Sequence, residues 1–145
     1  MGQRQGHKGV VVDVTFVERA PSAQEYLDLR DAVGWHGFSE AVASRSLDRS
    51  LYTVCAEHGG RVVGCGRVVG DGGVYFYVQD ILVHPAFQRQ GLGGSIMERV
   101  RGYLDAACGP GAFIGLMSAP GLENFYARYG FEPFPADSPG MMIWK

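Results

Sequence analysis

The sequence has no lysine between Lys8 and Lys145. The phosphate loop of nucleotide hydrolases needs a lysine after its last glycine to reach the γ-phosphate, so this class of site is excluded. The chain also has little net charge, −2 over 145 residues, and no apolar run near the roughly 18 residues of a membrane-spanning helix. We therefore expect neither a nucleic-acid-binding surface nor a membrane span.

Cysteine is scarce as well, with three residues and no Cys-x-x-Cys pair. An odd count without paired spacing argues against both a disulfide framework and a zinc site. Cys55, Cys65 and Cys108 are predicted to be small buried side chains in a reducing compartment, and a cytoplasmic protein without a metal is expected. Residues 1–9 are polar and lack the apolar core of a signal peptide, which predicts a flexible N-terminus before a single domain over residues 10–145.

What the chain does contain is apolar material for one core, since 46% of its residues are hydrophobic. Ser22 and Glu25 predict a capping box at the start of the first helix. Periodicity and turn residues predict strands at residues 10–18, 51–57, 61–69, 74–83, 112–118 and 141–144, and helices at residues 22–33, 39–50, 91–107 and 122–129. This order predicts a mixed α+β fold with helices on both faces of one sheet.

The most informative stretch is residues 81–97, where an apolar strand leads through a glycine-rich turn directly into an amphipathic helix. Gly91, Gly93 and Gly94 have no Cβ, so the backbone can turn several N–H groups toward one anion at the positive end of the helix. The spacing does not match the Gly-x-Gly-x-x-Gly turn of dinucleotide-binding folds, which lies in the first strand–helix unit. A binding site for a diphosphate is therefore predicted on this turn.

Two motifs of this chain resemble those of the GCN5-related N-acetyltransferases, the GNAT family. The run Gln88-Arg89-Gln90-Gly91-Leu92-Gly93 is similar to the family's motif A, Q/R-x-x-G-x-G/A, and Val83-His84-Pro85 is similar to the end of its fourth strand. The run Asn124 to Phe131 is similar to the later family pattern N-x-Y-x-x-x-G-F. The likeness is strong over residues 75–131 and only architectural over residues 10–69.

The resemblance implies a GNAT-type fold, in which a mostly antiparallel sheet splays into a V between strands four and five because strand four contains a bulge. It also implies acetyl-CoA as the acetyl donor, CoA as the product and no metal. The diphosphate would bind the turn, and the pantetheine arm would pair with the strand edge. The residues assigned to acetyl-CoA are Ile81, Leu82, Val83, Gln88, Arg89, Gln90, Gly91, Leu92, Gly93, Gly94, Asn124 and Tyr126.

Tyr126 is the predicted proton donor, since the family places a tyrosine at this point to protonate the departing thiolate. A phenol with a pKa of about 10 is protonated at neutral pH and can donate this proton. The alternative is a core aromatic side chain on an amphipathic helix, next to Phe125, Tyr129 and Phe131. Asn124 either bonds the pantetheine or caps its own helix.

Asp80, the only carboxylate on the fourth strand, is the predicted general base. Strict alternation places Asp80 on an apolar face with Phe76, Val78 and Leu82, which would raise its pKa toward that of a useful base. A bulge would change its direction. Two alternatives stay open: a structural aspartate that bonds the backbone at the bulge, and a chain of water molecules that carries the proton to solvent.

The acceptor is expected at the loop between the first two helices, where the family grips its acceptor. Trp35 and Phe38 stand in a glycine-flanked loop that suits a flat or aliphatic amine, or they plug the core. Tyr77, at the position where many relatives place a glutamate, is assigned to the same site.

The resemblance therefore predicts acetyl transfer to a primary amine by direct attack on the thioester. A small molecule is favoured because the sequence has no acidic run that would attract a polyamine or a histone tail. The alternatives are a protein or peptide acetyltransferase and a non-catalytic acyl-CoA-binding module. An exposed C-terminal strand is compatible with a homodimer.

Overall fold

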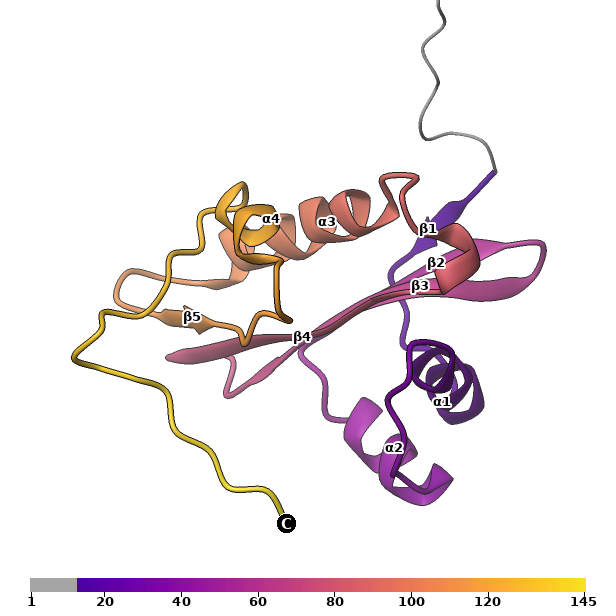
Figure 1. Ribbon diagram of the computed structural model, residues 1–145, viewed down its shortest axis with the longest axis horizontal. Coiled ribbons are helices and arrows are strands. Elements are labelled where there is room, and N and C mark those ends of the chain that lie inside the picture. The colour runs from indigo at the N-terminus through magenta and orange to yellow at the C-terminus, as the bar shows by residue number, and fades with distance from the viewer. Residues whose placement is uncertain (1–12) are drawn as a thin grey trace, which may run out of the picture.

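A computed structural model describes residues 13–145, which form one five-stranded sheet with helices on both faces (Figure 1). The strands are β1 (Thr15–Val17), β2 (Tyr52–His58), β3 (Arg61–Gly70), β4 (Tyr75–Val83) and β5 (Phe113–Gly115), and they follow this order across the sheet. The helices are α1 (Ala23–Ala32), α2 (Glu40–Leu47), α3 (Leu92–Ala107) and α4 (Glu123–Ala127), with a short 3₁₀ helix, η1 (Pro85–Phe87), before α3. The predicted flexible N-terminus and the first part of the predicted strand 10–18 lie outside the described residues.

The sheet is antiparallel from β1 to β4, and only β4 and β5 run parallel. Figure 1 shows α3 and α4 on one face of the sheet and α1 and α2 on the other. Ile96 and Val100 of α3 pack on Phe76 and Val78 of β4, while Leu29 of α1 packs on the opposite face. This arrangement confirms the predicted mixed α+β fold with a mostly antiparallel sheet.

The first two helices begin where the sequence predicts. The Ser22 hydroxyl accepts a hydrogen bond from the Glu25 N–H, and the Glu25 carboxylate accepts one from the Ser22 N–H, which confirms the capping box at α1. Ser39 caps α2 in a similar way by accepting a bond from the Val42 N–H. The loop that holds the predicted acceptor residues therefore runs from the C-cap of α1 at Val33, whose N–H donates to the Arg30 carbonyl oxygen, to the Ser39 cap of α2.

Strand β4 contains the bulge that the resemblance implied. The β3–β4 register shifts there, so that two residues of β4 stand opposite one residue of β3. Asp80 has a φ of 58°, in the left-handed region that aspartate tolerates better than most residues. The extra residue changes the face of the strand, because Phe76 and Val78 face α3 whereas Leu82 faces α1. The expectation of strict alternation, which grouped Asp80 with Phe76 and Val78, is therefore wrong.

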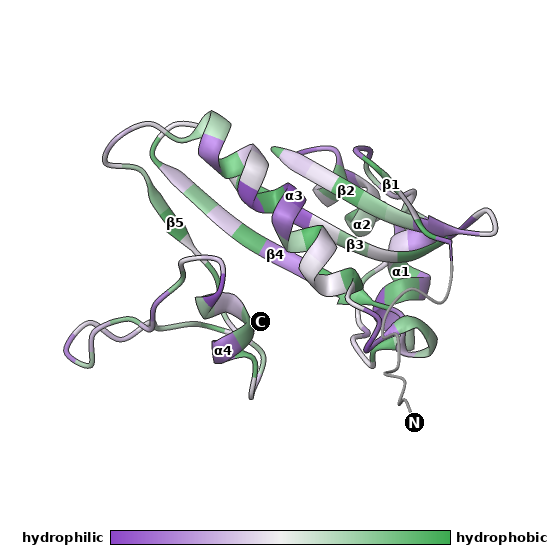
Figure 2. Cartoon of the chain, turned by 90° about the horizontal axis from the view of Figure 1, so that it is seen from above, coloured by the Kyte–Doolittle hydropathy of each residue, from purple (hydrophilic) through white to green (hydrophobic). Residues whose placement is uncertain are grey.

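The predicted splay between β4 and β5 is also present. The two strands pair only from Tyr75–Phe113 to Tyr77–Gly115 and then diverge (Figure 2). This short pairing also explains why β5 is shorter than the expected strand at residues 112–118. Residues 78–83 of β4 are left without a strand partner on this side in the part of the chain that the structure describes.

The predicted strand at residues 141–144 is wrong, because the chain forms no helix or strand after α4. Its four side chains are between 68% and 94% exposed. A strand needs a partner for its backbone hydrogen bonds, and no strand within residues 13–145 lies beside this segment.

The expectations about the cysteines, a membrane span and a metal site can also be compared with the structure. Cys55 and Cys65 are buried free thiols, as predicted, whereas Cys108 is only half-buried. Within residues 13–145, no helix has the length and apolar character needed to cross a membrane, and no three His, Cys, Asp or Glu side chains form a group that could hold a metal ion.

Candidate active site

A cleft of about 240 Å³ lies along the free edge of β4, and we call it the β4 cleft. One wall is β4 itself over residues 78–83, and the facing wall comes from the chain between β5 and α4 together with Tyr126 of α4. Trp35 borders it from the loop after α1. The fold thus brings together seven of the predicted site residues at this cleft: Trp35, Asp80, Ile81, Leu82, Val83, Gln88 and Tyr126.

The backbone of β4 is suited to bind an extended amide-bearing ligand. Its edge on the β3 side is occupied by the sheet, and its other edge over residues 78–83 has no strand partner among the described residues. A free strand edge offers a row of N–H and C=O groups that an extended chain can pair with. This geometry fits the pantetheine arm predicted from the resemblance.

The predicted phosphate turn leads into the N-terminus of α3. Gly91 is the N-cap residue, with a φ of 83° and no side chain capping the helix. Arg89 also has a positive φ, 66°, so the backbone of the turn takes left-handed conformations on both sides of Gln90. The first amides of an uncapped helix have no partner within the helix, and they carry its positive partial charge. The turn therefore fits a diphosphate at the mouth of the β4 cleft.

The side chains of the turn differ in what they can contact. Arg89 is exposed, and the Gln88 amide donates a hydrogen bond of 3.0 Å to the Val83 carbonyl oxygen. Leu92 is buried in the core, and the Gln90 side-chain oxygen is buried as well. Leu92 can therefore contribute to the turn only through its backbone.

Tyr126 has the properties of a proton donor at the cleft. Its ring is buried and lies edge-on to Phe125 and Phe131, with ring centroids 5.0 and 6.2 Å away. Burial alone raises the pKa of Tyr126, so the phenol stays protonated at neutral pH. The ring packs in the core, as the alternative interpretation held, yet the residue also lines the β4 cleft.

Asp80 lies in a polar and charged environment, which corrects the apolar face expected for it. Its carboxylate accepts hydrogen bonds from the Tyr26 hydroxyl at 2.7 Å, Arg67 Nε at 3.2 Å and Arg30 Nη1 at 3.3 Å. Only 3% of Asp80 is exposed. Burial, followed by the nearby carboxylate, raises the pKa of Tyr26 to about 12, so its phenol remains a donor. These four side chains tie α1, β3 and β4 together, and we call them the Asp80 cluster.

The sequence interpretation missed Tyr26, Arg30 and Arg67. Arg67 carried a usable signal, because it is a charged residue inside the apolar strand β3, and a buried charge requires a partner of opposite sign. Arg30 and Tyr26 are one helical turn apart on α1, so they reach the same partner.

The predicted acceptor residues occupy different positions. Trp35 and Phe38 are 40% and 52% exposed, so the interpretation of a core plug is wrong. Their rings lie 5.4 and 4.9 Å from the Arg30 guanidinium. Trp35 lines the β4 cleft, whereas Phe38 and Tyr77 do not. Burial raises the pKa of Tyr77, and a bond to the Met117 backbone opposes this shift.

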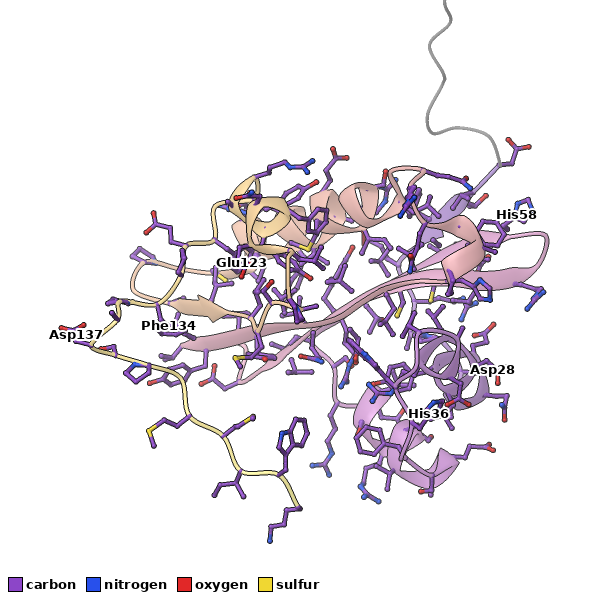
Figure 3. All side chains as sticks on the ribbon, in the orientation of Figure 1. Asp28, His36, His58, Glu123, Phe134 and Asp137 are labelled. Carbon is purple, nitrogen blue, oxygen red and sulfur yellow. The ribbon has the colours of Figure 1, made fainter. Side chains whose placement is uncertain are left out.

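A second, larger hollow of about 640 Å³ lies between β5, α4 and the chain that follows α4, and we call it the β5 cleft. Asn124 lines this cleft and not the β4 cleft. It does not cap α4 either, since Leu122 is the N-cap residue and no side chain caps this helix. Tyr126 lines both clefts. Glu123 and Phe134, labelled in Figure 3, border the β5 cleft from α4 and from the chain beyond it.

Comparison with known proteins agrees with this geometry. The family model described as "Acetyltransferase (GNAT) domain" matches residues 49–133. The chain is 30% identical to "Histone acetyltransferase TAP1" of Glycine max and 32% identical to "Serotonin N-acetyltransferase 2, chloroplastic" of Oryza sativa subsp. japonica. Both alignments cover 78% of this chain, which spans 53% and 58% of the length of these relatives.

Among solved structures, a probable acetyltransferase of unknown function from meticillin-resistant Staphylococcus aureus superposes with a TM-score of 0.86 at 31% identity. The superposition covers 92% of this chain and 100% of that chain. The same fold thus occurs in a relative of similar length.

Proposed function

Since the chain belongs to the GNAT acetyltransferase family, we propose that it transfers the acetyl group of acetyl-CoA to the primary amine of a small molecule, by direct attack of the amine on the thioester. The observation that carries this proposal is the meeting of the free β4 edge and Tyr126 at one cleft, with the uncapped start of α3 at its mouth. Acetyl-CoA supplies the activated acyl group. The chain positions this group and assists the proton transfers of the reaction.

The residues divide these tasks between them. The backbone of the turn from Gln88 to Gly94 binds the diphosphate, with Arg89 beside it, and the β4 edge binds the pantetheine arm. The Tyr126 hydroxyl donates a proton to the sulfur as it leaves. Asp80 acts as a positioning residue that holds the bulge, and the proton of the amine leaves through water.

Size and charge at the acceptor end support a small acceptor. The β4 cleft is narrow, about 240 Å³. Behind Trp35, the Asp80 cluster holds two guanidinium groups and one carboxylate, an excess of positive charge. Like charges across an interface oppose binding, so this end of the cleft disfavours a polycationic tail.

The relatives support different acceptors by name. One is named for serotonin, an aromatic small amine, and the other for histone. A protein acceptor would need a groove between the Trp35 loop and a last hairpin, and the described chain after α4 has no hairpin. A non-catalytic module would need a blocked acceptor end, whereas the ring of Trp35 is 40% exposed there.

A panel of acceptors tests the proposal. With acetyl-CoA and a thiol-detecting reagent, small monoamines of the arylalkyl or aliphatic type are expected to give a higher kcat/KM than spermidine or a lysine-rich peptide. A preference for the peptide would favour the protein acetyltransferase. Binding of acetyl-CoA without thiol release from any amine would favour the non-catalytic module.

The diphosphate assignment predicts a loss of affinity in Arg89→Glu. A charge-assisted contact contributes about 1.5–3 kcal/mol, so we expect CoA to bind the variant roughly 10- to 100-fold more weakly than the wild type. The difference in affinity between the variant and the wild type should be smaller at high salt, because salt screens the charges. Isothermal titration calorimetry measures this directly. Arg49→Glu, at an exposed arginine after α2, makes the same charge change and should leave the affinity unaltered. Equal affinities in the two variants would rule out a role for Arg89.

A further inference from the structure

The Asp80 cluster contains more positive than negative charge. Arg30 and Arg67 face a single carboxylate, that of Asp80, and the side chains of both arginines are only 12% exposed. A charge that is taken out of water needs a partner of opposite sign or strong hydrogen bonds. Within the described residues, one of the two guanidinium groups therefore has no carboxylate of its own, and their hydrogen bonds show which one.

Arg67 is the arginine that the fold itself uses. Its Nε donates a hydrogen bond to Asp80 at 3.2 Å, and its Nη1 donates to the Ser46 carbonyl oxygen at 3.0 Å and to the Ser50 hydroxyl at 2.9 Å. These bonds tie β3 to the end of α2 and to the bulge of β4. Arg67 and Asp80 thus form a neutral pair, and the charge of Arg30 is left in excess.

Arg30 makes longer hydrogen bonds and keeps free donors. Both of its guanidinium bonds within the described residues come from Nη1, at 3.3 Å to Asp80 and 3.4 Å to the Tyr26 hydroxyl. Its Nε is buried and has no hydrogen-bond partner among those residues. A guanidinium presents Nε–H and Nη2–H side by side, and this fork matches the two oxygens of a carboxylate. Arg30 therefore has both the charge and the donors that a carboxylate ligand requires.

The other carboxylates of α1 do not neutralise Arg30. Asp31 contacts His36 Nδ1 at 2.8 Å, and Asp28 accepts a hydrogen bond from the Gln24 amide at 2.7 Å. Both carboxylates are exposed to solvent. The excess charge of Arg30 is thus available to a ligand.

Arg30 lies at the acceptor end of the β4 cleft. Asp80 and Trp35 both line this cleft. The Arg30 guanidinium contacts the Asp80 carboxylate and lies over the Trp35 ring, 5.4 Å from its centroid. A ligand in the cleft would therefore meet Arg30 directly behind these two residues.

The rings of Trp35 and Phe38 cover the guanidinium and are themselves partly exposed. They belong to the loop at residues 34–38, in which Gly34 and Gly37 have positive φ values of 89° and 116°. No atom lies within 4 Å of the place where a Cβ would stand on either glycine. Glycine permits a wide range of backbone conformations, so the two rings can shift when a ligand reaches Arg30.

We propose that the acceptor is a small amino acid, a molecule with a carboxylate next to its amine, and that Arg30 binds this carboxylate. The proposal rests on the proposed function, because it names the class of amine that the same site takes. The bound carboxylate supplies the missing negative charge, and the amine, one carbon away, points into the β4 cleft. An apolar side chain on the acceptor would contact the exposed part of the Trp35 ring.

Matched pairs of acceptors test the role of the carboxylate. Phenylalanine is compared with phenethylamine and with phenylalaninamide, and leucine with 3-methylbutylamine, by thiol release from acetyl-CoA. The kcat/KM values are expressed per unprotonated amine, so that differences in amine pKa do not enter. Each acid should exceed its uncharged counterparts by about 10- to 100-fold, as a charge-assisted contact predicts.

The variant Arg30→Met assigns this preference to one residue. It removes the excess charge and leaves Asp80 with Arg67 and the Tyr26 hydroxyl, so circular dichroism should report a folded protein. The ratio of kcat/KM for phenylalanine to that for phenethylamine should fall to about one. Arg45→Met, at an exposed arginine of α2, makes the same charge change and should keep the wild-type ratio.

Calorimetry gives a readout that needs no turnover. Phenylalanine is titrated into the protein saturated with CoA, and it should bind at least about tenfold more tightly than phenethylamine to the wild type but not to Arg30→Met. Binding of this kind without thiol release would support the carboxylate site and refute the proposed function. Thiol release from the amines with no preference for the acids would do the reverse.

Two results overturn the proposal. One is equal kcat/KM and equal affinity for the acids and their uncharged counterparts in the wild type, and this comparison decides alone if Arg30→Met does not fold. The other is a preference for the acids that persists in folded Arg30→Met.

Discussion

Replacing Tyr126 with phenylalanine is expected to lower kcat and kcat/KM together, by roughly one to three orders of magnitude, while the affinity for acetyl-CoA stays the same. The ring of the variant still packs against Phe125 and Phe131, so the fold is kept. What disappears is a hydroxyl that meets the sulfur only as the thiolate forms, and such an interaction acts on the transition state. Steady-state kinetics with a saturating amine measures both constants.

Two controls separate this role from simple packing. Tyr103→Phe removes a hydroxyl from a tyrosine on α3 that stacks on Tyr52 outside both clefts, and its rate should equal that of the wild type. A thioester with a poorer leaving thiol should enlarge the defect of Tyr126→Phe. If Tyr126 only packs, the variant should lose about 1 kcal/mol of stability or less and keep its rate with both thioesters.

The second large effect is expected at Asp80. Asp80→Asn should lower the free energy of unfolding by about 3–5 kcal/mol, because Arg30 and Arg67 lose the buried carboxylate that both contact. Asparagine also tolerates a positive φ, so the bulge itself is not strained by the change. Urea denaturation measures the loss. Asp105→Asn, which breaks an exposed pair with Arg101 on α3, should cost only about 0.5 kcal/mol.

The pH profile then separates a positioning role from general-base catalysis. If Asp80 positions the bulge, the folded fraction of Asp80→Asn should show a profile of kcat/KM with the same shape as the wild type. If Asp80 is the base, the loss of rate should instead be largest at low pH, where unprotonated amine is scarce. A variant with full stability and a rate that collapses at low pH would return Asp80 to the role first predicted for it.

Local signals in the sequence predicted local structure well. The capping box at Ser22, the glycine turn before α3 and the order of the elements as far as α4 depend on residues close together in the chain, and the structure contains all three. The position of Tyr126 at the cleft followed from a family motif of eight residues.

The errors arose where one distant contact decides the outcome. A single extra residue in β4 turned Asp80 from the α3 face to the α1 face, and periodicity cannot locate such an insertion. The Asp80 cluster joins residues 26, 30, 67 and 80, which approach one another only after the sheet forms. The expected strand at residues 141–144 has the right side chains, but no strand among residues 13–145 lies beside it to supply the backbone hydrogen bonds.

The positive φ of Asp80 has a consequence for how this protein can diverge in evolution. The left-handed backbone at this position is tolerated by glycine, asparagine and aspartate. The buried guanidinium groups of Arg30 and Arg67 require an acidic partner, so aspartate alone meets both requirements. Trp35 and Phe38 are under no such restriction, since neither has a positive φ and their side chains are 40% and 52% exposed. In the proposed function, substitutions at Trp35 and Phe38 that change the acceptor can therefore accumulate while Asp80 stays fixed.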